Sequence, residues 1–215
     1  MNAPLPAQDN LLMSYLDLRK AIGWIGILLP LVVALGKYWF EGPGLEDSIS
    51  AYYHTIMRNV YVGSLVAMST FLFSYRGYDD HDARVSKLAA LAALVTALFP
   101  TAPASGATGN ALISSNIHAL SASMFFLCLV YFCLVLFRKS SHGILTPRKL
   151  LRNRVYSFCG YGLIVCLVLI VVSGFVFDPA TSKALHPKFW LESVADVLFG
   201  TAWLVKGEAI LKDRD

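Results

Sequence analysis

The segment DSISAYYHT places an acid, two serines, two tyrosines and a histidine between two long apolar runs. If this segment is helical, Ser50 and His54 lie one turn apart on the same face. Glu192 and Asp196 have the same spacing late in the chain, and a further histidine lies near the start of another apolar run. Imidazole and carboxylate groups bind zinc, and a catalytic zinc needs three protein ligands and one open position. The pattern therefore predicts a metal site formed by His54, His118, Glu192 and Asp196.

A zinc ion at this position would lower the pKa of its bound water to about 7 and create a nucleophile. We name Ser50, which would orient that water, and Asp47 as candidate catalytic residues. The candidate substrate-binding residues are Tyr53, Arg58 and Asn116.

A structural explanation of the same residues stays open. The tyrosines of the segment and the nearby Tyr61 are typical of the aromatic belt at a membrane surface. Glu192 would then favour the start of a helix, where a carboxylate interacts well with the helix dipole. Asp196 would pair with Arg58, and His118 would be a hydrogen-bonded core histidine.

The elements that carry these residues are those of a membrane protein. The chain has 215 residues, of which 56% are hydrophobic and 15% are charged. A soluble domain has about 25% charged residues. Six apolar runs have about the length that crosses a bilayer. They cover residues 21–40, 58–75, 84–102, 111–137, 155–177 and 190–211. We therefore predict an all-α, polytopic membrane protein with six transmembrane helices.

The lysines and arginines orient these spans, because cytoplasmic loops carry an excess of them. With the N-terminus inside, the external segments hold Lys37, Arg58, Lys183 and Lys188, and the other cations fall on the cytoplasmic side. Both termini are therefore predicted to be cytoplasmic, in a multi-pass protein of the plasma (inner) membrane. The domains are a cytoplasmic segment 1–20, a transmembrane domain 21–211 and a tail 212–215.

Two further groups contain residue types that can bind a metal ion or form a disulfide, but each group has a simpler explanation. The run DDHD at residues 79–82 lacks the spacing of an EF-hand, and we expect a solvated turn there. The four cysteines lie inside apolar runs without a CxxC motif, which is typical of packing. They are Cys128, Cys133, Cys159 and Cys166.

Two resemblances follow from these motifs. The Ser50-x-x-x-His54 element, with paired ligand types four apart on a late span, resembles the CREST superfamily of membrane hydrolases. That resemblance is partial, because Glu192 and Asp196 stand where the family has two histidines, and the chain has six predicted spans where the family usually has seven. The resemblance implies zinc and a lipid substrate. The run SISAYYHT, followed later by ALFPT, is similar to an uncharacterised group of small bacterial six-span membrane proteins, which implies no function.

Three functions fit this pattern. The first is a metal-dependent hydrolase of a lipid or amphiphile, with its pocket on the external side. The second is a small transporter or channel with an acidic external vestibule. The third is a non-enzymatic subunit or lipid-binding partner of a membrane complex. Membrane lipids are the expected partners in each case. Association with further copies of the same chain stays an open alternative. Nucleic acid is not expected, because the cations are explained by membrane orientation.

Overall fold

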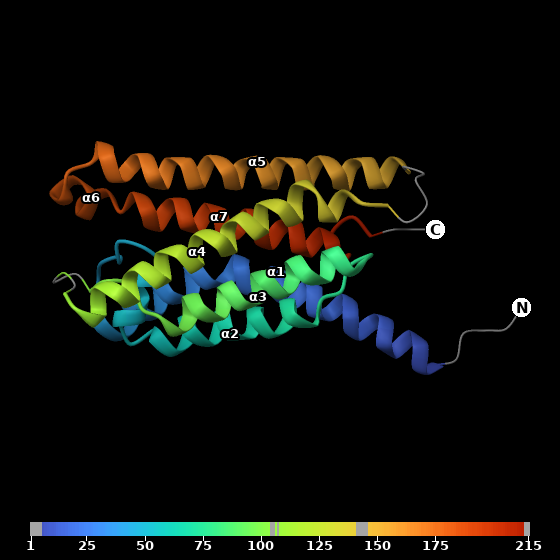
Figure 1. Ribbon diagram of the computed structural model, residues 1–215, viewed down its shortest axis with the longest axis horizontal. Helices are drawn as coiled ribbons and strands as arrows, with labels where there is room; N and C mark the ends of the chain where they lie inside the picture. The colour runs from blue at the N-terminus through green and yellow to red at the C-terminus, as the bar shows by residue number, and fades with distance from the viewer. Residues whose placement is uncertain (1–5, 104–105, 107, 141–145, 213–215) are drawn as a thin grey trace, which may run out of the picture.

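The computed structural model describes residues 6–103, 106, 108–140 and 146–212. Within these ranges the protein is all α-helical and contains seven α-helices, two short 3₁₀ helices and no strands, as the sequence predicts. The elements are α1 (Pro6–Glu41), η1 (Ser50–His54), α2 (Arg58–Ser74), α3 (Asp80–Leu98), α4 (Asn110–Leu134), η2 (Leu136–Arg138), α5 (Pro147–Val176), α6 (Pro179–Leu185) and α7 (Pro187–Lys206). The long helices lie side by side along one axis, and α5 is outermost on one side (Figure 1).

Three of the described helices are long and apolar enough to cross a membrane, rather than the six predicted. They are Tyr15–Glu41, Asn110–Arg138 and Pro147–Val176. The other three fall short for visible reasons. Helix α2 has 17 residues, and α3 begins with the charged run DHDAR and continues largely with alanines. Helix α7 carries Glu192, Asp196 and Lys206. The described part of the chain is therefore a helical bundle with three candidate spans, which is typical of a multi-pass membrane protein.

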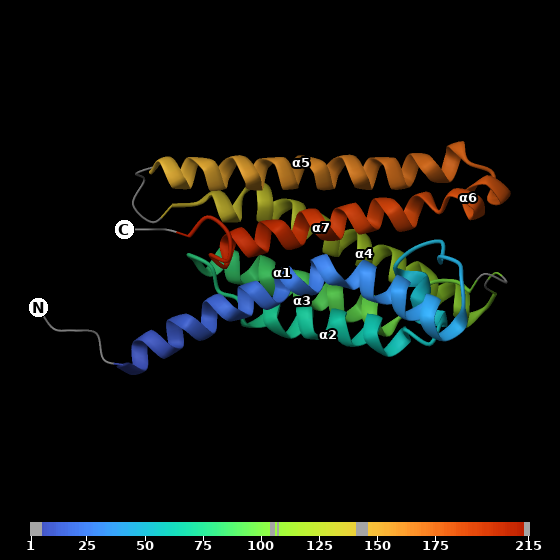
Figure 2. The same cartoon turned by 180° about the vertical axis from the view of Figure 1, so that it is seen from behind.

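Glycines allow the backbones of α1 and α7 to come close together. A Cβ atom placed on Gly200 would lie 2.5 Å from the carbonyl oxygen of Gly23. A Cβ atom on Gly26 would lie 3.2 Å from the carbonyl oxygen of Asp196. Small residues permit this close approach of helices in membranes, so the interface positions α7 against α1 along much of its length. Seen from behind, α1 runs alongside α7 across the middle of the bundle (Figure 2).

An aromatic layer fills the half of the bundle that contains both the start of α3 and the end of α7. Its centre is Trp203, which has no exposed surface. The ring centroids of Tyr75, Phe132 and Phe137 lie 5.2, 5.6 and 5.1 Å from that of Trp203. Aromatic rings at such distances pack favourably and leave little space. This layer packs the interior of the bundle around the last turns of α7.

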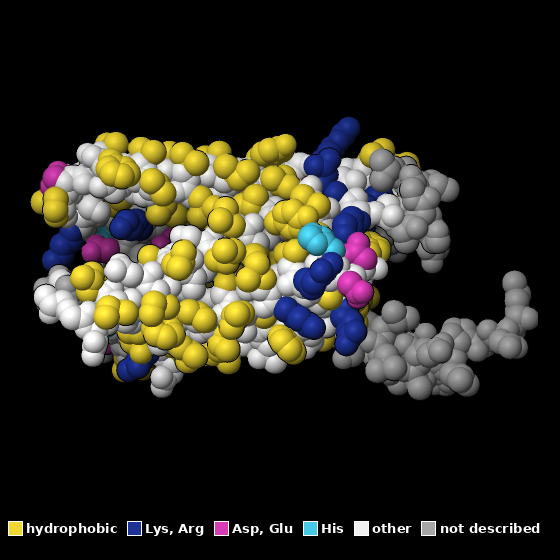
Figure 3. All heavy atoms as spheres, in the orientation of Figure 1, with side chains coloured by type: hydrophobic (Ala, Val, Ile, Leu, Met, Phe, Trp, Pro, Cys, Tyr) yellow, Lys and Arg dark blue, Asp and Glu magenta, His cyan; other side chains and the backbone are white. Residues whose placement is uncertain are grey.

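The cations are distributed unevenly along the bundle. Among the described residues, Lys37, Arg58, Lys183 and Lys188 lie at the end where α1 finishes and α7 starts. The remaining described lysines and arginines lie at the opposite end, which we call the basic end. Figure 3 shows this basic end on the right and hydrophobic side chains over the middle of the same face. A hydrophobic belt between polar ends is the surface that a bilayer requires.

The short helix α6 joins the fifth and sixth predicted spans and was not anticipated from the sequence. Asp178 caps it by accepting hydrogen bonds from the amides of Ala180 and Thr181 at 2.9 and 3.1 Å. Hydrogen bonds from Thr181, its hydroxyl first, hold the pKa of Asp178 below its usual value. His186 then adopts φ 47° and ψ 48° between α6 and α7. This left-handed turn fixes where α7 begins.

Candidate functional site

A small cavity lies at the end of the bundle opposite the basic end. Its volume is about 50 Å³, and about 10–15 Å³ of such space holds one water molecule. Leu29, Leu65, Met68, Phe125 and Phe126 form its apolar walls. Its polar groups come from η1 and from four different helices, namely Ser50, Tyr61, Thr96, His118, Glu192 and Asp196. The cavity can therefore hold a few water molecules or one small ligand among converging polar groups.

Two carboxylates enter the cavity from α7, where Glu192 and Asp196 are separated by one helical turn. Oε2 of Glu192 accepts a hydrogen bond of 2.7 Å from the amide of Ile49, which fixes the chain just before η1 to α7. No hydrogen bond or ion pair of the Asp196 carboxylate is found within the described residues. No lysine or arginine lines the cavity. Two carboxylates in a poorly solvated space repel each other when both are charged, and a bound cation relieves that repulsion.

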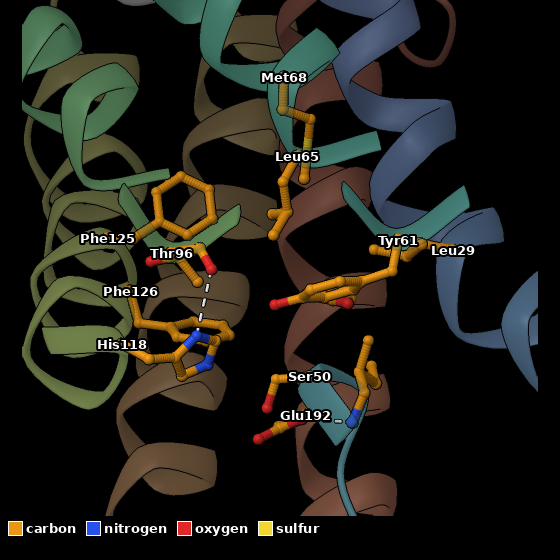
Figure 4. A pocket seen from close by; sticks show the side chains of 12 residues that line it. Leu29, Ser50, Tyr61, Leu65, Met68, Thr96, His118, Phe125, Phe126 and Glu192 are labelled. Atoms are coloured by element: carbon orange, nitrogen blue, oxygen red, sulfur yellow. Dashed lines mark hydrogen bonds between the residues drawn. The ribbon is translucent and has the colours of Figure 1, made fainter. Parts of the chain in front are cut away.

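His118 faces the carboxylates from α4 and is held by the end of α3. Its Nδ1 lies 2.8 Å from the carbonyl oxygen of Phe99 and 3.1 Å from that of Thr96. Carbonyl oxygens only accept, so Nδ1 carries the proton and donates to them. In the neutral ring Nε2 is then the basic atom. Figure 4 shows the His118 ring across the cavity from Ser50 and Glu192.

Two of the polar residues that line the cavity were not predicted as site residues. Tyr61 is 3% exposed, and its hydroxyl points toward the centre of the cavity (Figure 4). Thr96 donates a hydrogen bond to the carbonyl oxygen of Ala92 at 2.8 Å, and its hydroxyl lies 3.0 Å from that of Ser121. The structural explanation of the sequence, one of the two open alternatives, places Tyr61 in an interfacial belt. A tyrosine or threonine inside an apolar run can nevertheless indicate a buried polar site, because a buried hydroxyl needs a polar partner.

Ser50 reaches the cavity, whereas His54 does not line it. The predicted one-turn spacing assumed an α-helix, but residues 50–54 form a 3₁₀ helix. With three residues per turn, a residue four positions later points away from the first. His54 is exposed, and its Nε2 lies 2.9 Å from the carbonyl oxygen of Thr101. The geometry separates Ser50 from His54, which form one of the two motifs behind the CREST resemblance.

The other predicted residues lie around the cavity rather than in it. The exposed side chain of Asp47 has Oδ1 3.4 Å from Nδ1 of His186. The Arg58 guanidinium stacks 4.2 Å from the ring of Tyr53 and also donates to its hydroxyl. Asn116 is exposed on α4. The predicted pairing of Asp196 with Arg58 is not formed, because Arg58 contacts Tyr53 instead.

The predicted zinc ligands do not fit a zinc site in this arrangement. His118, Glu192 and Asp196 share the cavity, but no three histidine, cysteine or acidic side chains of the described ranges are grouped closely enough to hold a metal ion. His54 is separated from the cavity, and Nδ1 of His118 already donates to backbone carbonyls. Zinc stays a prediction of the sequence, and no reaction step is derived through it.

Comparison with known proteins identifies no relative of this chain. No protein-family model, curated protein or solved structure matches the chain. Functional conclusions therefore depend on the geometry of the cavity and the distribution of charge.

Proposed function

We propose that this protein is a multi-pass membrane protein of the small-transporter or channel class that binds a small monovalent cation in its acidic cavity. The single observation behind this proposal is the pair Glu192 and Asp196, which share a small cavity that no lysine or arginine lines. His118, Tyr61 and Ser50 supply neutral oxygen and nitrogen atoms around them. Carboxylate and hydroxyl oxygens are typical ligands for hard cations, and a carboxylate also binds an ammonium group.

All six long helices cross the membrane in this proposal. Helix α7 packs against α1 and α5, and α2 packs against α3, so polar residues on the less hydrophobic helices have protein neighbours. Ionisable residues inside a membrane normally face the interior of a bundle or a water-filled cavity. Glu192 and Asp196 satisfy this condition. Helices α2, α3 and α7 therefore cross despite their lower hydropathy.

The basic end faces the cytoplasm in this proposal, which places both termini inside and the cavity at the external side of the plasma membrane. This orientation follows the excess of lysine and arginine on cytoplasmic segments. In this proposal the closely packed aromatic layer around Trp203 blocks passage from the cavity to the basic end. A transported cation would therefore bind from outside first, and its release inside requires rearrangement of this layer.

Thermal unfolding of the purified protein tests cation binding directly. Protein in mild detergent would be heated in sodium, potassium, ammonium or methylammonium chloride at constant ionic strength, with the bulky N-methylglucamine ion as reference. A ligand that binds the folded state stabilises it by about 2.7 kcal/mol at one hundred times its Kd. One or more of these small cations should raise Tm. The rise should disappear in Asp196→Asn.

Asp178→Asn is the matched control, because it removes the same charge from an exposed helix cap. It should keep the cation-dependent rise in Tm. Equal Tm values in every salt, or an unchanged rise in Asp196→Asn, would contradict the proposal. Flux of the selected cation into proteoliposomes then separates a transporter from a protein that only binds it.

A further inference from the structure

A groove at the basic end lies between η2 and the first turns of α5. It has a volume of about 390 Å³. Its lining residues are Arg138, Leu150, Asn153, Arg154 and Ser157. The groove therefore combines two guanidinium groups, an amide and a hydroxyl with one apolar side chain. It lies at the opposite end of the molecule from the acidic cavity.

The positive charge of this groove is not neutralised by the described protein. Nη1 of Arg138 donates a long hydrogen bond of 3.4 Å to the carbonyl oxygen of Leu134. Neither Arg138 nor Arg154 forms an ion pair within the described ranges, and no acidic residue lines the groove. Guanidinium groups match phosphate oxygens in geometry as well as in charge. An anion with several oxygen atoms fits this combination.

An exposed apolar stripe continues from the groove along α5. Tyr161, Val165, Val168 and Val172 follow Ser157 at helical spacing. Their exposed fractions are 61%, 55%, 55% and 43%. From Tyr161 to Val172 the helix rises about 16 Å, which matches half of a hydrocarbon core about 30 Å thick. The stripe thus has the length of one bilayer leaflet and begins at the cationic groove.

We propose that this groove binds the headgroup of an anionic phospholipid. The phosphate lies between Arg138 and Arg154, while Ser157 and Asn153 bond oxygen atoms of the headgroup or glycerol. One acyl chain lies along the stripe from Tyr161 to Val172. A free phosphate would use only the groove, whereas a phospholipid uses the groove and the stripe together. Basic pockets between helices are known to suit such headgroups, and hydrocarbon is the natural neighbour of exposed valines.

The test measures lipid binding by native mass spectrometry of the detergent-solubilised protein with added phosphatidylglycerol or phosphatidylcholine of equal chain length. The wild-type protein should retain phosphatidylglycerol at least tenfold more strongly than phosphatidylcholine. In the double variant Arg138→Gln, Arg154→Gln the affinity for phosphatidylglycerol should be at least tenfold lower than in the wild-type protein. Ser157→Ala keeps both arginines and should lose a smaller part, so the site can be tested even if the double variant folds poorly.

Arg76→Gln with Arg84→Gln is the matched control, since it removes the same charge at the same end from a separate groove that also contains Asp80. This control should keep the preference for phosphatidylglycerol. An equal loss in the control would show that the overall positive charge of the basic end, rather than this groove, causes the preference for phosphatidylglycerol. That result would overturn the proposal. Displacement of the lipid by equimolar glycerol phosphate or inorganic phosphate would also overturn it, because the occupant would then be a free phosphate. Unchanged preference in the arginine double variant and in Ser157→Ala would exclude the groove.

Discussion

The ammonium group of Lys139 lies 2.8 Å from Oδ2 of Asp79, and this contact joins the segment after η2 to the start of α3 across 60 residues of sequence. Lys139 also donates to Oδ1 of Asp82. Asp79 caps α3 by accepting a 2.9 Å hydrogen bond from the amide of Asp82. The side chain of Asp82 has no exposed surface, so this part of the predicted solvated turn is buried. These contacts hold the connection between α2 and α3 against the connection between α4 and α5 at the basic end.

The first prediction concerns the titration of Asp79. Hydrogen bonds from Lys139 and then from the Asp82 amide lower the pKa of Asp79 from 3.8 to about 2. A carboxyl with a lowered pKa in the folded state stabilises that state above pH 3.8 and loses this contribution as the pH falls toward about 2. Carbon-13 NMR of the labelled carboxyl should give a midpoint near 2, and Lys139→Gln should move it upward toward 3.8. An unchanged midpoint in this variant would remove Lys139 as the cause.

The second prediction concerns the buried partner in the same cluster. Lys139→Met leaves the Asp82 carboxylate buried without its cation, which is strongly destabilising. Because Lys139 is itself partly exposed, we expect a loss of about 2 kcal/mol in the free energy of unfolding. Lys20→Met is the control, since it removes an exposed pair with Asp17 and should cost less than about 0.5 kcal/mol. Denaturant unfolding in mixed micelles measures both, and equal losses would contradict the prediction.

The third prediction concerns the contact of α1 with α7. Gly200→Ala would place a methyl group 2.5 Å from the backbone oxygen of Gly23, so one helix must shift. We expect a loss of about 1–3 kcal/mol, as is typical when a group is added to a well-packed interface. Gly174→Ala in α5 is the matched control, because nothing lies within 4 Å of its added Cβ. That control should be neutral or slightly stabilising in thermal unfolding, whereas a stable Gly200→Ala protein would argue against the close approach.

The fourth prediction concerns the hydrogen bond between Glu192 and the Ile49 amide. Glu192→Ala removes the acceptor, so hydrogen exchange of the peptide that contains Ile49 should become faster. Asp196→Ala on the same helix makes no such contact and should leave this exchange unchanged. Mass spectrometry of deuterated peptides covering 47–55 provides the measurement. Equal acceleration in both variants would indicate a general disturbance of α7 rather than loss of one bond.

The fifth prediction concerns the pairing of α2 with α3. Ser69 donates a 2.7 Å hydrogen bond to the carbonyl oxygen of Ala90 on the neighbouring helix. Ser69→Ala should lower the free energy of unfolding by about 0.6–1.7 kcal/mol, the range of hydrogen bonds between membrane helices. The exposed Thr70 bonds only within its own helix, to Val66, so Thr70→Ala should change stability by less than about 0.5 kcal/mol. Guanidinium unfolding would compare the two.

Local patterns predicted the helical class and singled out four of the six polar residues that line the cavity. Four-residue spacing on a long helix was sufficient to bring Glu192 and Asp196 to one face, and both share the cavity with His118 and Ser50. The predicted chemical roles of these residues remain predictions. The position of His54 could not be foreseen, because five residues of DSISAYYHT form a 3₁₀ helix whose turn differs from that of an α-helix.

Hydropathy of the separate runs predicted six spans, whereas three of the described helices are long and apolar enough to cross a membrane. The six runs are defined by their apolar stretches, and the charged residues in α7 and at the start of α3 lower the hydropathy of those helices. The burial of Asp82 depends on Lys139, 57 residues away, and no local pattern contains that information. Long-range partners of this kind account for most of what the sequence left unpredicted.

The depth of Asp196 along α7 has an electrical consequence for the proposed cation site. Asp196 lies nine residues beyond Pro187, which corresponds to about 13 Å along the helix. A cation that reaches it from outside crosses somewhat under half of a hydrocarbon core about 30 Å thick. Moving one elementary charge through the full membrane potential is worth about 2.3 kcal/mol per 100 mV. An inside-negative potential of 100 mV would therefore favour occupancy by about 1 kcal/mol, or roughly fivefold, and make the cavity voltage-sensitive.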